Sequence, residues 1–437
     1  MVARRVSGLK NCLGAPILLL IFMGVSFLTR FGVPQYFIFG LFSLYGVSFL
    51  LLNSGTTISF IKIKNFYLLQ FFMLFYMCFF LSIPIKFPIN EFGVWRLEGV
   101  MVFSSIILAN LVVLHSSERS IYFSLKILEM VSSFMVFESV LFFILPDHWN
   151  IFRSDMEAGY RFISLLTSGY TQTGLFLILG YVVKLQLKSL SAARGAILFL
   201  LFLFALVQTE DRTSLLTFIG INTLYFFKHL KVKGCIPNGV SSIVLITSCV
   251  FMLLISYGVF SSLSDRSNIL STSSLIDRYS LVMRGIDVAS AVMPWGGGPG
   301  SSVRLMMSDN ILLKEHGESI FISEDELIKR YKHLKIKRAN GQTMSTHNTY
   351  LDFIISFGVV GLMVSFVLFM TQLRAFYKVF SSKLRTYHIS EIFYCCSICL
   401  FMAVSFTTTI WLWVLMFRIH VFFQNQQLIE RVSVARQ

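Results

Sequence analysis

Three short polar segments carry residue types that could bind a phosphate and accept a proton. The segment 209–214 reads Thr-Glu-Asp-Arg-Thr-Ser, and the segment 277–300 contains Arg278, Arg284 and a glycine-rich run. The segment 345–351 contains His347 and Asn348 at the start of an apolar run. Arginine binds phosphate oxygens through paired hydrogen bonds, and a helix N-terminus adds unpaired backbone N–H groups. These residue types together are typical of a site for a phosphate or pyrophosphate group.

Composition indicates that membrane helices position these segments. Of the 437 residues, 55% are hydrophobic, 14% are charged and 46 are Phe, and the mean hydropathy is +0.73. A soluble protein could not cover so much apolar surface, whereas side chains that face lipid stay apolar. The net charge of +15 lies mostly in short Lys and Arg clusters between apolar runs, which is typical of membrane topology. We therefore expect an all-α polytopic integral membrane protein and no nucleic-acid partner.

Apolar runs long enough to cross hydrocarbon as helices divide the chain into about twelve expected spans. They are 13–29, 34–52, 65–85, 98–115, 122–145, 162–183, 190–208, 213–229, 239–261, 347–370, 389–406 and 408–424. No small-residue cleavage site follows the first run, so we expect it to be an uncleaved anchor.

Lys and Arg in the short loops orient these spans with both ends of the chain in the cytoplasm. Residues 1–261 then hold the first nine spans, residues 262–346 form one large outer loop, and residues 347–437 hold the last three spans and a cytoplasmic tail. The loop contains one expected helix, 323–338, supported by opposite charges four residues apart. All three polar segments lie at the outer face in this topology.

Two carboxylates lie within the expected fifth span, where a charge is costly. Lys126 stands one turn from Glu129 and offers it an ion-pair partner. Glu138 has no such neighbour in the sequence, and we expect it to line a hydrophilic cavity. The seven cysteines show no disulfide framework and no metal-ligand spacing, so neither a metal ion nor another cofactor is expected.

The polar segments resemble motifs of the O-antigen polymerase and ligase family. His347-Asn348-Thr349-Tyr350-Leu351, followed by Gly358 and Gly361, resembles the family's His-Asn-x-x-Leu…Gly-x-x-Gly signature. Pro294 with the glycines 296–298 resembles its Pro-x-x-Gly-x-Gly element, and the residues 212–216 resemble Ser-Arg-x-x-Leu-Leu. Arg161 and Gly174 match an earlier Arg…Pro-Asn-x-x-Gly element. The likeness covers about the last two-thirds of the chain.

The sequence departs from these motifs at three places. Asp211 stands where the family often has Ser before the arginine, and Ser356 stands where an acidic residue commonly precedes the first glycine. The residues 170–172, Tyr-Thr-Gln, replace the Pro-Asn pair.

The resemblance implies glycan transfer from undecaprenyl pyrophosphate at the periplasmic face of a bacterial inner membrane, without a metal ion. The large outer loop is then periplasmic, and the architecture is similar to that of multi-span lipid-linked glycosyltransferases. Arg212, Arg278 and Arg284 are assigned to the pyrophosphate, and His347 is assigned as general base or as a donor that positions the acceptor sugar. A chain-length regulator is a further expected partner.

Other residues follow the same resemblance, and several alternatives stay open. Arg161, Asn348 and Tyr350 are expected to bind substrate. The spacing fits Arg278 and Arg284 equally well, Arg212 could instead anchor a span end at the headgroups, and His347 could be only a neighbour of a helix cap.

The favoured function is that of an O-antigen polymerase, which extends the glycan on an incoming lipid-linked repeat unit in lipopolysaccharide biosynthesis. The first alternative is the ligase, which delivers the glycan to the lipid A core. The second is a flippase or other transporter of lipid-linked oligosaccharides. A transporter places its charges near the membrane midplane and often has two similar halves, whereas here the arginines and His347 lie at the expected outer face and the halves do not match.

Overall fold

A computed structural model describes helices from two regions of the chain. The described residues are 118–145, 161–167, 169–187, 192–232, 272–298, 301–306, 346 and 348–381, with single positions between 40 and 51 and at 332, 392 and 396. His347, the expected loop helix 323–338 and the expected spans before 118, at 239–261 and after 388 lie wholly or almost wholly outside them. Every regular element in the described part is a helix, as the composition predicted.

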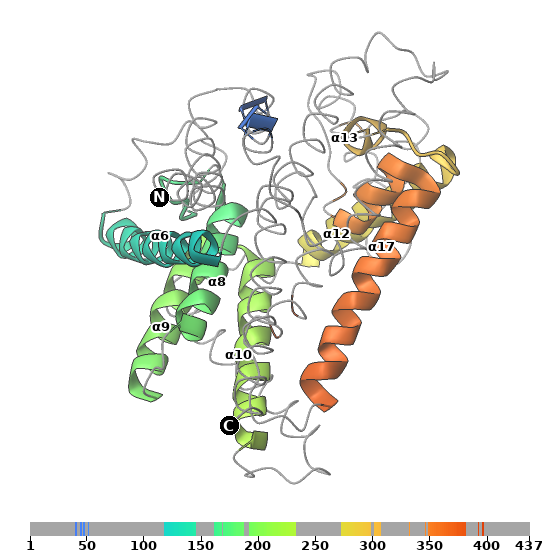
Figure 1. Ribbon diagram of the computed structural model, residues 1–437. Coiled ribbons are helices and arrows are strands. Elements are labelled where there is room, and N and C mark those ends of the chain that lie inside the picture. Colours follow the sequence, from blue (N-terminus) through green and yellow to red (C-terminus); the bar gives the residue numbers. More distant parts are fainter. Residues whose placement is uncertain are drawn as a thin grey trace.

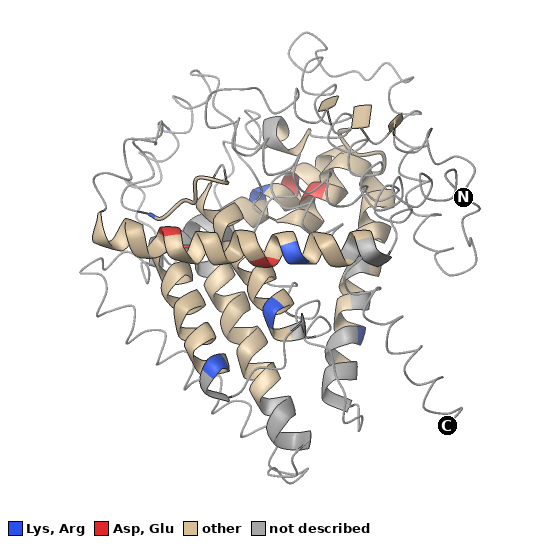
Figure 2. Ribbon diagram, turned by 60° about the vertical axis from the view of Figure 1, so that its left-hand side comes forward, with Lys and Arg blue, Asp and Glu red and all other residues tan. Residues whose placement is uncertain are grey.

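The first group contains α6 (Glu118–Ile144), α8 (Tyr170–Leu187), α9 (Ala192–Thr209) and α10 (Arg212–Val232). The start of α8 meets the start of α10, since an added Cβ on Gly174 would lie 2.5 Å from Ser214 Oγ, and the Phe162 N–H donates to the Gln208 carbonyl at the end of α9 at 2.8 Å. Helix α6 lies across α8 and α9 (Figures 1 and 2). Helices α6 and α8 are in close contact at Gly180 of α8, where an added Cβ would lie 1.9 Å from the Ser132 Oγ of α6.

The second group contains α12 (Thr272–Val292), the single turn α13 (Ser302–Leu305) and α17 (Thr349–Ser381). These elements share a small apolar core built from Val288, Val292, Leu305, Met306 and Ile355. Helix α12 falls inside the segment expected to be a loop with its one helix at 323–338. It is a helix that the sequence did not predict there, and both candidate arginines, Arg278 and Arg284, lie on its 21 residues.

Helix α17 breaks at Gly358, whose φ of 57° and ψ of −129° are not helical. The two parts fold back on each other, since Ser365 Oγ donates to the Tyr350 carbonyl at 3.1 Å and Tyr350 Oη donates to Gln372 Oε1 at 2.5 Å. The part 349–357 is only about 13 Å long, whereas the hydrocarbon core is about 30 Å thick. The expected span 347–370 is therefore not one straight helix: the candidate span Thr349–Arg374 breaks at Gly358, and the part 359–381 is long enough by itself to cross a bilayer.

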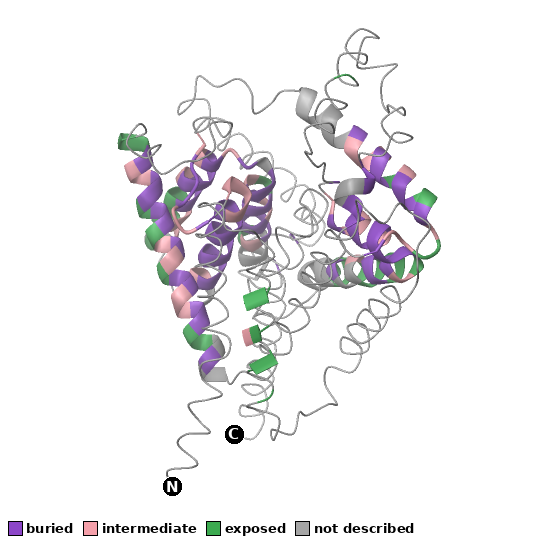
Figure 3. Ribbon diagram, turned by 90° about the horizontal axis from the view of Figure 1, so that it is seen from above, coloured by how far each residue is buried: buried purple, intermediate pink, exposed green. Residues whose placement is uncertain are grey.

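The exposed face of α6 is apolar, unlike the exposed face of a helix in a soluble protein. On α6 the exposed side chains include Phe123, Met130, Phe134, Phe137 and Phe143, and the buried ones include Ser124, Glu129, Ser132, Glu138 and Ser139. Figure 3 shows the exposed residues along the outer side of this helix. Apolar side chains outside and polar side chains inside are what lipid as solvent favours. By length and composition, Tyr122–Ile144 and Thr349–Arg374 are long and apolar enough to cross a membrane.

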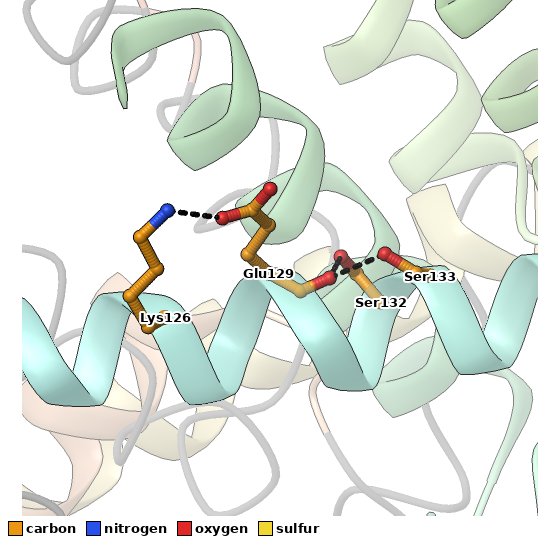
Figure 4. A network of polar contacts seen from close by, with 4 residues as sticks. All are labelled: Lys126, Glu129, Ser132 and Ser133. Atoms are coloured by element: carbon orange, nitrogen blue, oxygen red, sulfur yellow. Dashed lines mark hydrogen bonds and ion pairs between the residues drawn. The ribbon is translucent and has the colours of Figure 1, made fainter. Parts of the chain in front are cut away.

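The predicted ion pair on α6 is confirmed. Lys126 Nζ lies 3.0 Å from Glu129 Oε2, and the Glu129 carbonyl accepts hydrogen bonds from Ser132 and Ser133 (Figure 4). The two charges neutralise each other on a helix whose exposed face is apolar, so the pair has a structural role.

We predict that Gly358→Ala destabilises the protein by about 2 to 4 kcal/mol. Its φ is positive, and an added Cβ would lie 2.0 Å from the Pro294 carbonyl oxygen. Gly195→Ala is the matched control, because an added Cβ there meets nothing within 4 Å. Thermal unfolding of the purified full-length variants in detergent is the measurement. Equal melting temperatures for the two variants would contradict the break.

Candidate functional site

The turn between α9 and α10 is organised by Asp211. Its carboxylate accepts hydrogen bonds from Thr213 N at 3.3 Å and from Ser214 Oγ at 2.5 Å, and its carbonyl accepts one from Leu215 N at 3.0 Å. Asp211 is thus the N-cap of α10, and Arg212 is the first residue of that helix. Serine and aspartate are both preferred N-caps, which explains how Asp211 can stand where the family has serine.

Arg161 lies beside this turn. Its Nε donates to Glu210 Oε2 at 3.1 Å, and its Cζ lies 4.8 Å from the centre of the Tyr170 ring. The second residue of the earlier motif, Gly174, also meets the turn, since an added Cβ would lie 2.5 Å from Ser214 Oγ. The structure therefore brings Arg161 and Gly174 to the start of α10, where Arg212 stands.

Glu138 anchors the segment that carries Arg161. Its carboxylate accepts hydrogen bonds from the Ser164 hydroxyl and, at 3.1 Å, from Leu165 N. Ser164 N in turn donates to Thr173 Oγ1 of α8 at 3.2 Å. The expectation that Glu138 lines a hydrophilic cavity is therefore wrong. Its partners come from a segment 26 residues further along the chain, which no local pattern in the sequence indicates.

The glycine-rich run after α12 closes the break in α17. Gly297 N donates to the Ile355 carbonyl at 2.7 Å, Gly298 N donates to the Ser356 carbonyl at 3.1 Å, and Val359 N donates to the Pro294 carbonyl at 2.9 Å. A helix break leaves carbonyl and N–H groups without helical partners, and buried ones are costly unless paired. The two glycine motifs, far apart in the sequence, are thus two sides of one backbone junction.

This junction sets α12 against the residues that flank His347. An added Cβ on Gly285 would lie 3.0 Å from Leu351 Cδ1 and 3.5 Å from Thr346 Cγ2. The neighbouring Arg284 is buried, with 3% of its surface exposed. Arg278 lies six residues earlier on α12, which is about 9 Å along a helix.

Asp352, which the sequence did not single out, organises the start of α17. Its Oδ1 accepts a hydrogen bond from Thr346 Oγ1 at 2.7 Å, and Thr346 Oγ1 also accepts one from Asn348 N at 3.2 Å. Asn348 Oδ1 caps the helix by accepting from Leu351 N at 3.1 Å. The residues on both sides of His347 are therefore held by one buried network. Its only signal in the sequence is an acidic residue in the first turn of the helix.

Residues 197–367 match a family model described as O-Antigen ligase. The matched region is less than half of the chain, but it contains the turn at Asp211, helix α12, the glycine junction and the start of α17. The match over residues 197–367 supports a likeness to the O-antigen polymerase and ligase family. No curated protein and no solved structure matches the chain.

The O-antigen polymerase and ligase family comprises glycosyltransferase-like enzymes of glycan assembly that are embedded in membranes, which agrees with the exposed apolar side chains of α6 and α17. The predicted site residues fall into two clusters of this chain. Arg161 and the first residue of α10, Arg212, belong to the first helix group, and Arg284, Asn348 and Tyr350 belong to the second. Among the described residues, no group of three or more His, Cys, Asp and Glu could hold a metal ion.

We predict that Asp211→Ala lowers the free energy of unfolding by about 1 to 2 kcal/mol, because α10 loses its cap. Asp211→Ser keeps an oxygen that can accept the Thr213 N–H, so we expect it to retain most of the stability and the full activity. Thermal unfolding and complementation of a deletion strain are the measurements. A loss of activity in Asp211→Ser at unchanged stability would show that the carboxylate has a further role.

Proposed function

We propose that this enzyme is an O-antigen polymerase that transfers the growing glycan from undecaprenyl pyrophosphate to the sugar of an incoming lipid-linked repeat unit. The observation that carries the proposal is the placement of Arg284, a buried cation on α12 whose neighbour Gly285 touches Thr346 and Leu351, on either side of His347. A buried arginine on a helix that packs against the residues flanking His347 suits a reaction that expels pyrophosphate and needs a proton acceptor.

The reaction would proceed by direct displacement. The acceptor hydroxyl attacks the anomeric carbon of the donor sugar, and the bond from that carbon to the pyrophosphate oxygen breaks, with inversion. His347 takes the proton of the attacking hydroxyl, while Arg212 and Arg284 neutralise the charge that develops on the pyrophosphate. The reaction takes place at the periplasmic face of a bacterial inner membrane, with the lipid carrier held in the bilayer.

Arg161 belongs to the donor side of this proposed site, because it lies at the turn that starts α10. Asn348 and Tyr350 belong to the acceptor side with His347. In the structure their polar groups bond Leu351 N and Gln372 respectively, so we assign them to holding the helix at His347 as well as to lining the site.

The ligase reaction is the second candidate, because the matching family model is described as O-Antigen ligase. Both reactions use the same donor, and only the acceptor differs. The departures from the shared motifs at Asp211 and Ser356 favour the polymerase, since polymerases vary with the sugar repeat that they join.

We predict that a deletion strain makes lipopolysaccharide with a single repeat on its core, and that wild type restores the ladder while His347→Ala does not. The measurement is a lipopolysaccharide gel, with membrane levels of each variant checked by immunoblot. Polymer that accumulates on the carrier lipid while the core stays bare would identify a ligase instead. A normal ladder from His347→Ala would show that His347 is no catalytic residue.

We also predict that Arg284→Lys reduces glycan transfer by tenfold or more, about the loss expected when a bidentate arginine contact to phosphate is removed. Arg278→Lys is the matched control on the same helix, and we expect it to retain transfer within about twofold. Lysine keeps the charge and nearly the volume, so the fold is preserved. Transfer from a lipid-linked donor in purified membranes is the measurement, and the reverse ranking would assign the pyrophosphate to Arg278.

A further inference from the structure

The ion pair between Arg161 and Glu210 joins two segments that the chain separates by 49 residues. Glu210 Oε2 accepts from Arg161 Nε, and the Tyr170 ring packs against the guanidinium at 4.8 Å. These contacts use one edge and one face of the guanidinium. The edge that carries the two Nη groups is used by neither contact, and 40% of the Arg161 side-chain surface is exposed.

The backbone that carries Arg161 is held from three directions. The Phe162 N–H donates to the end of α9 at Gln208, Leu165 N donates to Glu138 of α6, and Ser164 N donates to Thr173 of α8. A side chain that starts from a fixed backbone and has its Nε and one face engaged is preorganised for a ligand.

Glu210 occupies the position after α9, where helices commonly end on a glycine with positive φ. Its φ is 52°, and no other non-glycine residue in the described part of the chain has a positive φ. A positive φ is costly for a residue with a Cβ, and a half-exposed ion pair returns little stability.

We propose that Glu210 is a positioning residue which, together with Tyr170, orients Arg161 so that its two Nη groups bind the pyrophosphate of the lipid-linked donor. The inference rests on the proposed function for the identity of the ligand. Arg161 then supplies a second cation to the donor side of the site, next to the first turn of α10 at Arg212. Glu210 itself touches the guanidinium and not the substrate.

The test is binding of inorganic pyrophosphate to the purified full-length protein in nanodiscs, by isothermal titration. We expect Glu210→Gln to weaken pyrophosphate binding about tenfold, because the neutral amide holds the guanidinium less firmly. Arg161→Lys should weaken it to a similar extent. The double variant should be no weaker than Arg161→Lys alone, since Glu210 acts through Arg161.

Two further variants separate binding from folding. Glu210→Gly removes the carboxylate and relieves the positive φ, so it should be at least as stable as wild type and yet bind pyrophosphate as weakly as Glu210→Gln. Lys126→Gln is the matched control, because it breaks an ion pair of similar length, 3.0 Å, and similar exposure on α6 (Figure 4). It should leave pyrophosphate binding unchanged.

Either of two results would overturn the inference. Wild-type affinity for pyrophosphate in Glu210→Gln and Glu210→Gly would mean that the ion pair is only a brace between segments. No binding of pyrophosphate by wild type would mean that the arginines serve no such anion. A deletion strain with unaltered lipopolysaccharide is a different failure, because it contradicts the proposed function and leaves the pyrophosphate affinities as measured.

Discussion

The second cluster of predicted site residues, with Arg284, Asn348 and Tyr350, depends on one constraint. The backbone groups left unpaired at the break in α17 must find hydrogen-bond partners. In a bilayer, irregular backbone is tolerated only where protein supplies the missing hydrogen-bond partners. The glycine run after α12 supplies them, through the bonds from Gly297 and Gly298 to the carbonyls of Ile355 and Ser356. Only glycine allows this approach, since an added Cβ on Gly296 would lie 2.5 Å from Gly358 N. The junction thereby holds α12 against the residues around His347.

The first cluster of predicted site residues, with Arg161 and Arg212, depends on side-chain hydrogen bonds instead. Glu138 and Asp211 are buried carboxylates, and each accepts hydrogen bonds that fix a chain segment: 162–167 in one case and the start of α10 in the other. Polar groups buried among apolar helices have few possible partners, so such networks specify one arrangement. The two clusters are thus held by different means, the second by backbone pairing and the first by buried carboxylates.

Local sequence patterns predicted what depends on local properties. The apolar runs predicted helices at 122–145, 190–208 and 213–229 to within a few residues of α6, α9 and α10, because hydrophobic length sets where a membrane helix can lie. They did not indicate α12, a more polar helix within the expected outer loop, or the break in α17, which lies inside an apolar run. Hydropathy indicates whether a segment lies in lipid or in water, but it does not indicate where the backbone changes direction.

The sequence by itself determined the class of solvent, the family motifs and the residue types at the site, since these follow from composition and from short-range order. Only the tertiary structure decided that Arg161 contacts Glu210 and Tyr170, and that Glu138 accepts a hydrogen bond from Ser164. It also decided that Arg284 is buried on α12 and that the next residue, Gly285, lies against Thr346. These contacts join segments far apart in the chain. Their geometry depends on how helices pack and on which backbone groups pair, and a short stretch of sequence does not show either.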